Sequence, residues 1–124
     1  MTVPSVNDHL LQARANRAHA EWLLSVSPSD PTALHWAVTA AFYSALHGLT
    51  AHLMTQGITV SSHAARAKAL ADPNTGVPQA ILYDYRTLEA QSRGARYELW
   101  SFVMQDVQNL VSQELAAIAA FTGM

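Results

Sequence analysis

Six polar and aromatic residues of this sequence form three pairs, each spaced by about one helical turn. The pairs are Tyr43 with His47, His63 with Arg66, and Ser92 with Arg96. Side chains three or four residues apart lie on the same face of a helix, so each pair presents two functional groups together. An imidazole can act as a general base, and a guanidinium can hold a phosphate and stabilise its developing charge. We predict that His47, His63 and Arg96 approach a common pocket.

His63 and Arg66 fall at the start of a predicted short helix. The first backbone N–H groups of a helix have no partner within the helix, and together with a nearby arginine and histidine they can bind an anion. The same spacing also fits a surface histidine beside a solvated arginine. The anion site at His63 and Arg66 is therefore one of two interpretations.

Arg96 shares a stripe with the apolar residues Tyr85 and Leu88 if the fourth predicted helix continues through Gly94. An arginine is rarely buried without a partner. One interpretation is an ion pair with Glu114, which falls on the apolar face of the last helix and would fix the helix register. The other is that Arg96 binds a phosphate or another ligand.

The six histidines do not follow the spacing of a metal site. His47 and His52 are five residues apart, about 140° around a helix, and neither Glu-x-x-His nor His-Glu-x-x-His occurs. We predict no metal and no cofactor, although three histidines from different helices, His35 or His47 with His63, stay open as an alternative. No cysteine, Gly-rich phosphate loop or Ser–His–Asp arrangement supports other chemistry.

Helix signals recur along the chain, and alternating Val/Ile/Thr-rich runs typical of strands are absent. The chain is predicted to be all-α, an up-and-down bundle of four to five helices in a single domain over residues 1–124. The expected helices are Val6 to Leu24, Pro31 to about Gln56 with Asp30 as N-cap and Gly57 as C-terminal cap, Ser61 or Ser62 to Ala71, Pro78 to about Arg93, and Ser101 to Phe121.

The central helix, Pro31 to Gln56, divides into three sectors by its periodicity. The aliphatic sector is Val38, Phe42, Leu46, Leu49 and Leu53; the mixed sector is Trp36, Tyr43, His47 and Met54; the small-residue sector is Ala37, Ala41, Ser44, Ala45 and Gly48. Covering all three requires more neighbours than a small monomer supplies, so we predict a symmetric homodimer through the small-residue sector.

The first and last helices each show an apolar stripe of their own. In the first it comprises Leu10, Leu11, Ala15, Ala18 and Trp22, and in the last it comprises Val103, Val107, Leu110, Val111, Ile118 and Phe121. We expect both stripes to face the core.

The composition indicates a folded domain with much covered surface, because 50% of the 124 residues are hydrophobic and only 13% are charged. A formal charge of −2 gives no overall positive field for nucleic acid or anionic lipid, so any such contact would be local. The start of the chain has no signal-peptide pattern, and the uncharged stretch 33–54 is too rich in Ala, Ser, Thr and His for a membrane span. A cytoplasmic location is expected.

The order of these motifs resembles a bacterial branch of the HEPN superfamily, the higher eukaryotes and prokaryotes nucleotide-binding domain. The resemblance covers roughly Asp30 to Phe121. Its motifs are Trp36, then Ala41-Phe42-Tyr43-Ser44-Ala45-Leu46-His47, Gly57, Ser62-His63-x-x-Arg66, and Tyr85-x-x-Leu88-x-x-x-Ser92-x-x-Ala95-Arg96-Tyr97. It implies a bundle of four or five helices, usually dimeric, in a superfamily whose members often act on RNA or belong to toxin–antitoxin and other defence systems.

One departure from the superfamily concerns catalysis. Its ribonucleases carry an arginine followed four to six residues later by a histidine, late in the bundle, whereas no histidine follows Arg96 here. The formal match from Arg14 to His19 lies in the first helix, the wrong element. The resemblance therefore implies a homodimer that binds a nucleotide or RNA.

Two alternatives to plain ligand binding remain. The first is a metal-independent ribonuclease with His47, His63 and Arg96 as catalytic residues. Whether the protein only binds RNA or also cleaves it, the ligand-binding residues would be Tyr43, Arg66, Ser92 and Tyr97. The second is an interaction partner of a nucleotidyltransferase-type protein.

Overall fold

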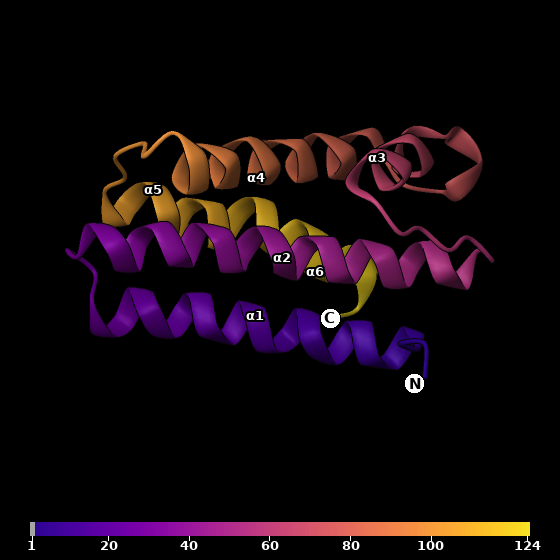
Figure 1. Ribbon diagram of the computed structural model, residues 1–124, viewed down its shortest axis with the longest axis horizontal. Coiled ribbons are helices and arrows are strands. Elements are labelled where there is room, and N and C mark those ends of the chain that lie inside the picture. The colour runs from indigo at the N-terminus through magenta and orange to yellow at the C-terminus, as the bar shows by residue number, and fades with distance from the viewer. Residues whose placement is uncertain (1) are drawn as a thin grey trace.

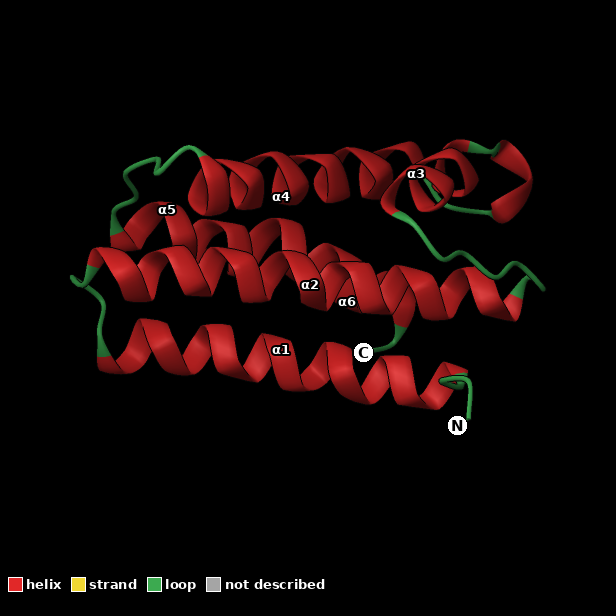
Figure 2. Ribbon diagram, viewed as in Figure 1, coloured by secondary structure: helices red, strands yellow, loops and turns green. Residues whose placement is uncertain are grey.

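The computed structural model describes residues 2–124 as a bundle of helices, without a strand in that range (Figures 1 and 2). The helices are α1 (Val6–Val26), α2 (Pro31–Thr55), α3 (His63–Ala71), the 3₁₀ turn η1 (Pro73–Thr75), α4 (Gln79–Tyr97), α5 (Met104–Asn109), the π-helical segment η2 (Leu110–Leu115) and α6 (Ala116–Thr122). Since α5, η2 and α6 follow one another without a break, they form one long last helix. The all-α bundle of four to five helices is confirmed.

The predicted caps set the helix ends. The Asp30 side chain accepts a hydrogen bond from the Thr32 N–H, and Ser62 accepts one from the Ala65 N–H. Gly57 follows α2 with φ of 78°, a left-handed conformation that glycine adopts without strain. Because α3 begins directly after its Ser62 cap, His63 is its first residue.

Two predicted ends were wrong by a few residues. Helix α4 continues past Arg93 to Tyr97, because Gly94 keeps its place in the helix and the Trp100 ring packs against its bare Cα. The last helix begins at Met104, so Val103 precedes it and is exposed.

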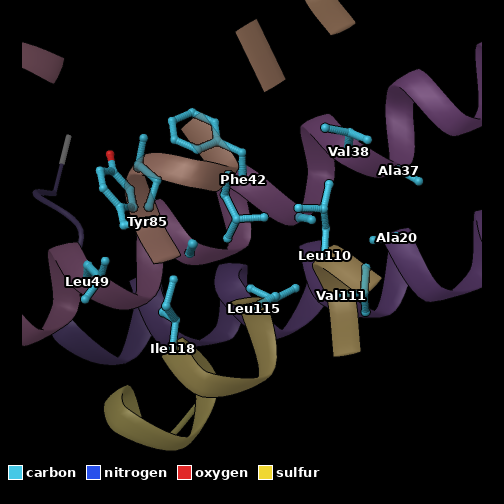
Figure 3. Packing of buried hydrophobic residues seen from close by; sticks show 14 of the residues in the cluster. Ala20, Ala37, Val38, Phe42, Leu49, Tyr85, Leu110, Val111, Leu115 and Ile118 are labelled. Atoms are coloured by element: carbon cyan, nitrogen blue, oxygen red, sulfur yellow. The ribbon is translucent and has the colours of Figure 1, made fainter. Parts of the chain in front are cut away.

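Helix α2 runs through the middle of the molecule, with α1 along one side and α4 along the other (Figure 1). The whole aliphatic sector of α2 is buried, as predicted. It packs with residues of α4 and the last helix, including Tyr85, Leu115 and Ile118, in one core (Figure 3). The core thereby fixes the rotation of α2 and α4.

The small-residue sector of α2 is covered within the chain. Ala41 and Ala45 are fully buried, and the Ser44 hydroxyl donates to the Ala13 carbonyl of α1 at 2.7 Å. A Cβ on Gly48 would lie 2.7 Å from the Met124 sulfur. The prediction that a second copy packs on this sector is wrong, because α1 and the C-terminus occupy it.

The predicted core-facing stripe of α1 was also wrong. Ala13 and Ala20 are the fully buried residues of this helix, whereas Leu11 is 53% and Trp22 55% exposed. Small residues let α1 approach the small-residue sector of α2 closely, so Leu11 and Trp22 lie on the outer face, whereas Leu23 and Leu24 near the end of α1 pack against the core.

Among residues 2–124, no helix is both long and apolar enough to cross a membrane. This agrees with the expectation that the uncharged stretch 33–54, which forms most of α2, is not a membrane span.

Candidate functional site

The guanidinium of Arg96 lies between α2 and α4, surrounded by neutral groups. Its Nη1 donates to the Tyr43 hydroxyl at 3.0 Å, and its Nε donates to the Ser92 carbonyl at 3.3 Å. Its central carbon lies 5.6 Å from the ring centroid of Phe42, 5.5 Å from that of Tyr43 and 5.0 Å from that of Tyr97. At these distances the three rings attract the guanidinium by cation–π interaction. Together with the two hydrogen bonds, they fix the position of the Arg96 side chain.

A cavity of about 130 Å³ opens beside Arg96, between α2, α3 and α4. Its lining is Phe42, His63, Glu89, Arg93, Arg96 and Tyr97. The His63 ring stacks on Phe42, with centroids 6.3 Å apart and planes 22° apart. The N-cap at Ser62 positions His63, and the core positions Phe42, so two elements fix this wall.

The charged groups of this cavity are the two guanidiniums of Arg93 and Arg96 and the single carboxylate of Glu89, and the imidazole of His63 lies beside them. The ring of Tyr85 packs against Phe42 at 5.7 Å between centroids, and its pKa is raised to about 12 by burial and then by the charge of Glu89, against an opposing effect of Arg66. Tyr85 is therefore a neutral phenol at physiological pH. The positively charged groups outnumber the carboxylate, so the cavity suits an anion.

A second hollow of about 190 Å³ adjoins the other side of Arg96. Its walls include His35, Trp36 and Thr39 of α2, and the Trp36 ring is 60% exposed. Because Arg96 lines both spaces, a single guanidinium separates two openings along the α2–α4 groove.

His63 and Arg96 come together as predicted, but His47 does not join them. The His47 Nδ1 lies 3.0 Å from the His9 Nδ1 on α1, and the two rings stack. Burial, followed by His9 and Arg66, lowers the pKa of His47. The prediction of a shared pocket was wrong for His47 because its position on α2 turns it toward α1.

Of the four predicted ligand-binding residues, Tyr97 lines the cavity and Tyr43 holds Arg96. Arg66 is buried instead, and its Nε donates to the Thr50 hydroxyl of α2 at 2.9 Å. Ser92 is fully buried and contributes its carbonyl to Arg96. Arg66 and Ser92 are therefore buried and do not line the cavity.

The ion pair between Arg96 and Glu114 is not formed. Within residues 2–124 the one salt bridge joins Arg17 to Glu21 on α1. Glu114 borders a different pocket, beyond α4. This interpretation was wrong because the two side chains line different spaces, Arg96 those at α2 and Glu114 the pocket beside Trp100 and Phe102.

The alternative of a three-histidine metal site finds no support in the described part of the chain, where no three metal-ligating side chains cluster. His35 donates from Nε2 to the Trp100 carbonyl at 2.6 Å, and His52 does the same to the Thr75 carbonyl at 2.7 Å. His35 and His52 thus connect α2 by hydrogen bonds to the segment after α4 and to the 3₁₀ turn η1.

Sequence reasoning missed three residues of the cavity, Phe42, Glu89 and Arg93. Glu89, Arg93 and Arg96 follow one another at intervals of four and three residues in α4, which was a readable signal of one polar face. Phe42 was assigned to the core alone. Its ring is indeed buried in the core, but it also borders the cavity.

Comparison with known proteins shows the fold alone. No family model matches the chain, and no curated protein matches it. The crystal structure of TT1696 from Thermus thermophilus is similar, with a TM-score of 0.77 and 21% sequence identity over 98% of both chains. The same arrangement of helices is thus reached by a distantly similar sequence.

Proposed function

We propose that this chain is a HEPN-like helical bundle that binds a phosphate-bearing ligand, a nucleotide or RNA, in the cavity beside Arg96. The observation that supports this most is the grouping of Arg93, Arg96 and His63 around one opening. Arginine is suited to phosphate because its planar fork can form two parallel hydrogen bonds.

The aromatic residues of the site favour a ligand that carries bases. Tyr97 is 71% and Trp36 60% exposed, one on each side of the Arg96 region. Exposed rings beside basic side chains are typical of surfaces that stack single-stranded nucleic acid. Glu89 offers an acceptor for a ribose hydroxyl or a base amine.

The sizes of the two openings favour a short strand over a single enclosed nucleotide. At about 130 and 190 Å³ each is below the roughly 300 Å³ at which pockets for drug-sized ligands begin. Each can hold a fragment, such as a phosphate or a base. A strand that crosses Arg96 would use both.

Titration of a short single-stranded RNA, with inorganic phosphate and AMP as smaller probes, tests this proposal. Arg96→Ala should weaken RNA binding at least about tenfold while the bundle stays folded. Arg86→Ala is the matched control, because Arg86 is an exposed arginine of the same helix outside the cavity. Equal losses in both variants, or no RNA binding by the wild-type protein, would refute the proposal.

A metal-independent ribonuclease is the second candidate, favoured by the shared position of His63 and Arg96 on one cavity. His63 would take the proton of a 2′-OH, whose oxygen would attack the adjacent phosphorus and displace the 5′-oxygen of the next nucleotide; that oxygen would take a proton from water, and Arg96 would stabilise the phosphate. Cleavage of RNA in the presence of EDTA, lost in His63→Gln and absent with a 2′-deoxy substrate, would support it. Cleavage that survives His63→Gln would contradict it.

The homodimer, the cytoplasmic location and the role in a toxin–antitoxin or defence system are further parts of the proposal, as is a nucleotidyltransferase-type partner. A partner would be sought by co-expression with proteins encoded next to this one. Loss of RNA binding on complex formation would place that partner over the cavity.

A further inference from the structure

A third space, a pocket of about 530 Å³, lies between α4, the segment 98–103 and the start of the last helix. It shares no lining residue with the two openings beside Arg96. Its walls combine the rings of Trp100 and Phe102 with the carboxylates of Asp106 and Glu114. No Lys, Arg or His is among the described residues that line it, in contrast to the cavity beside Arg96.

The aromatic wall of this pocket is held in place by its own contacts. The backbone N–H of Trp100 donates to the Gly94 carbonyl at 3.1 Å, and the backbone carbonyl of Trp100 accepts from His35 Nε2 at 2.6 Å. The Trp100 ring lies so close to Gly94 that an added Cβ would be 2.1 Å from it. Phe102 packs edge-on against His35, with centroids 5.7 Å apart. Trp100 is nevertheless 42% exposed, so a ligand can reach it.

One carboxylate oxygen of the partly buried Glu114, Oε2, is buried and has no hydrogen-bond partner within residues 2–124. A buried carboxylate oxygen without a partner is costly, and a cation bound beside the group would offset that cost. Glu114 belongs to the π-helical segment Leu110–Leu115, a kind of distortion that often marks a functional site.

From these contacts we infer that the pocket binds a small organic cation, a protonated alkylamine. The faces of Trp100 and Phe102 attract a cation, and Glu114 and Asp106 supply opposite charge. The side-chain carbonyl oxygen of Gln91, which also lines the pocket, can accept a further ammonium N–H group, whereas the Asn109 Oδ1 already accepts from Gln105 Nε2 at 2.8 Å. A hydrocarbon arm fits against the rings.

Titration with putrescine and spermidine, followed by NMR of the tryptophan indole N–H signals, tests the inference. The chain has three tryptophans, and only the Trp100 signal should shift, so Trp22 and Trp36 serve as internal controls. The uncharged analogue 1,4-butanediol should produce no shift. Shifts of all three signals would indicate general association with an acidic protein and would overturn the inference.

Two variants and one control complete the test. Glu114→Gln keeps the shape and removes the charge, and Trp100→Leu removes the ring; each should weaken amine binding at least about tenfold. Glu98→Gln removes an exposed carboxylate that does not line the pocket and should leave binding unchanged. The inference fails if putrescine and spermidine do not bind at millimolar concentration, or if Glu98→Gln weakens binding as much as Glu114→Gln.

Discussion

At the scale of single residues, the neutral surroundings of Arg96 determine what its removal should do to stability. Breaking a buried ion pair would destabilise the fold by about 3–5 kcal/mol, but Arg96 contacts a hydroxyl, a carbonyl and three rings. We expect Arg96→Ala to lower the free energy of unfolding by about 1–2 kcal/mol, from the loss of two hydrogen bonds to neutral acceptors and of the cation–π contacts. Urea denaturation measures this. A loss above about 3 kcal/mol would indicate a structural role that these contacts do not explain.

The His9–His47 pair predicts a pH dependence of stability. The pKa of His47 is lowered from its ordinary value of 6.5, so the fold favours the neutral imidazole. Protonation then favours the unfolded chain. The stabilising contribution is present above about pH 6.5 and is lost as the pH falls through the lowered pKa.

Denaturation at pH 8 and pH 5 measures this dependence. His47→Gln should reduce the difference between the two pH values, because it removes the titrating group. His19→Gln, a change at an exposed histidine of α1, should leave the difference as in the wild-type protein. An unchanged pH dependence in His47→Gln would contradict the assignment.

At the scale of elements, Gly94 joins α4 to the segment that follows it. Alanine is favoured over glycine in a helix by about 1 kcal/mol, but here its Cβ would lie 2.1 Å from the Trp100 ring. The ring must move, so Gly94→Ala should destabilise the protein by about 1–3 kcal/mol and shift Trp100 fluorescence. Combined with Trp100→Ala, the same change should be neutral or stabilising. Destabilisation by Gly94→Ala without the Trp100 ring present would show that the close contact is not the cause.

The helix bounds were largely predictable because capping is local. Asp30, Pro31, Ser62 and Gly57 act within a few residues of their own position, and each ends or begins a helix where expected. The buried face of α1 was not predictable in the same way. Its alanines occur on more than one side, and only the small-residue sector of α2 decides which of them are buried.

The candidate site depends on the whole molecule and was therefore only partly predictable. The one-turn spacing put Tyr43 and His47 on one sector of α2, but in the structure Tyr43 accepts from Arg96 of α4 whereas His47 meets His9 of α1. Whether His47 faces α3 or α1 depends on where those helices pack, which local spacing does not record. The burial of Arg66 was equally unpredictable from local spacing, because its hydrogen-bond partner, the Thr50 hydroxyl, lies on a different helix, α2.

At the scale of the whole molecule, the outer face of α1 replaces the small-residue sector as the expected dimer contact. Leu11, Ala15, Ala18, Trp22 and Val26 form an exposed apolar stripe on it. In an antiparallel pair of α1 helices with the two-fold axis between Ala15 and Ala18, Leu11 of one copy would meet Trp22 of the other. This large–small–small–large pattern is self-complementary, as a two-fold interface requires.

We therefore expect Trp22→Glu to produce a monomer, because it places a charge opposite Leu11 of the second copy. The wild-type dimer should bury at least about 1,000 Å² in total, and light scattering at micromolar concentration measures the mass. Trp36→Glu is the matched control, since Trp36 is equally exposed but lies on α2 beside the Arg96 groove; that variant should stay dimeric and lose RNA binding instead. A monomeric wild-type protein, or a dimer that survives Trp22→Glu, would exclude this face of α1 as the dimer contact.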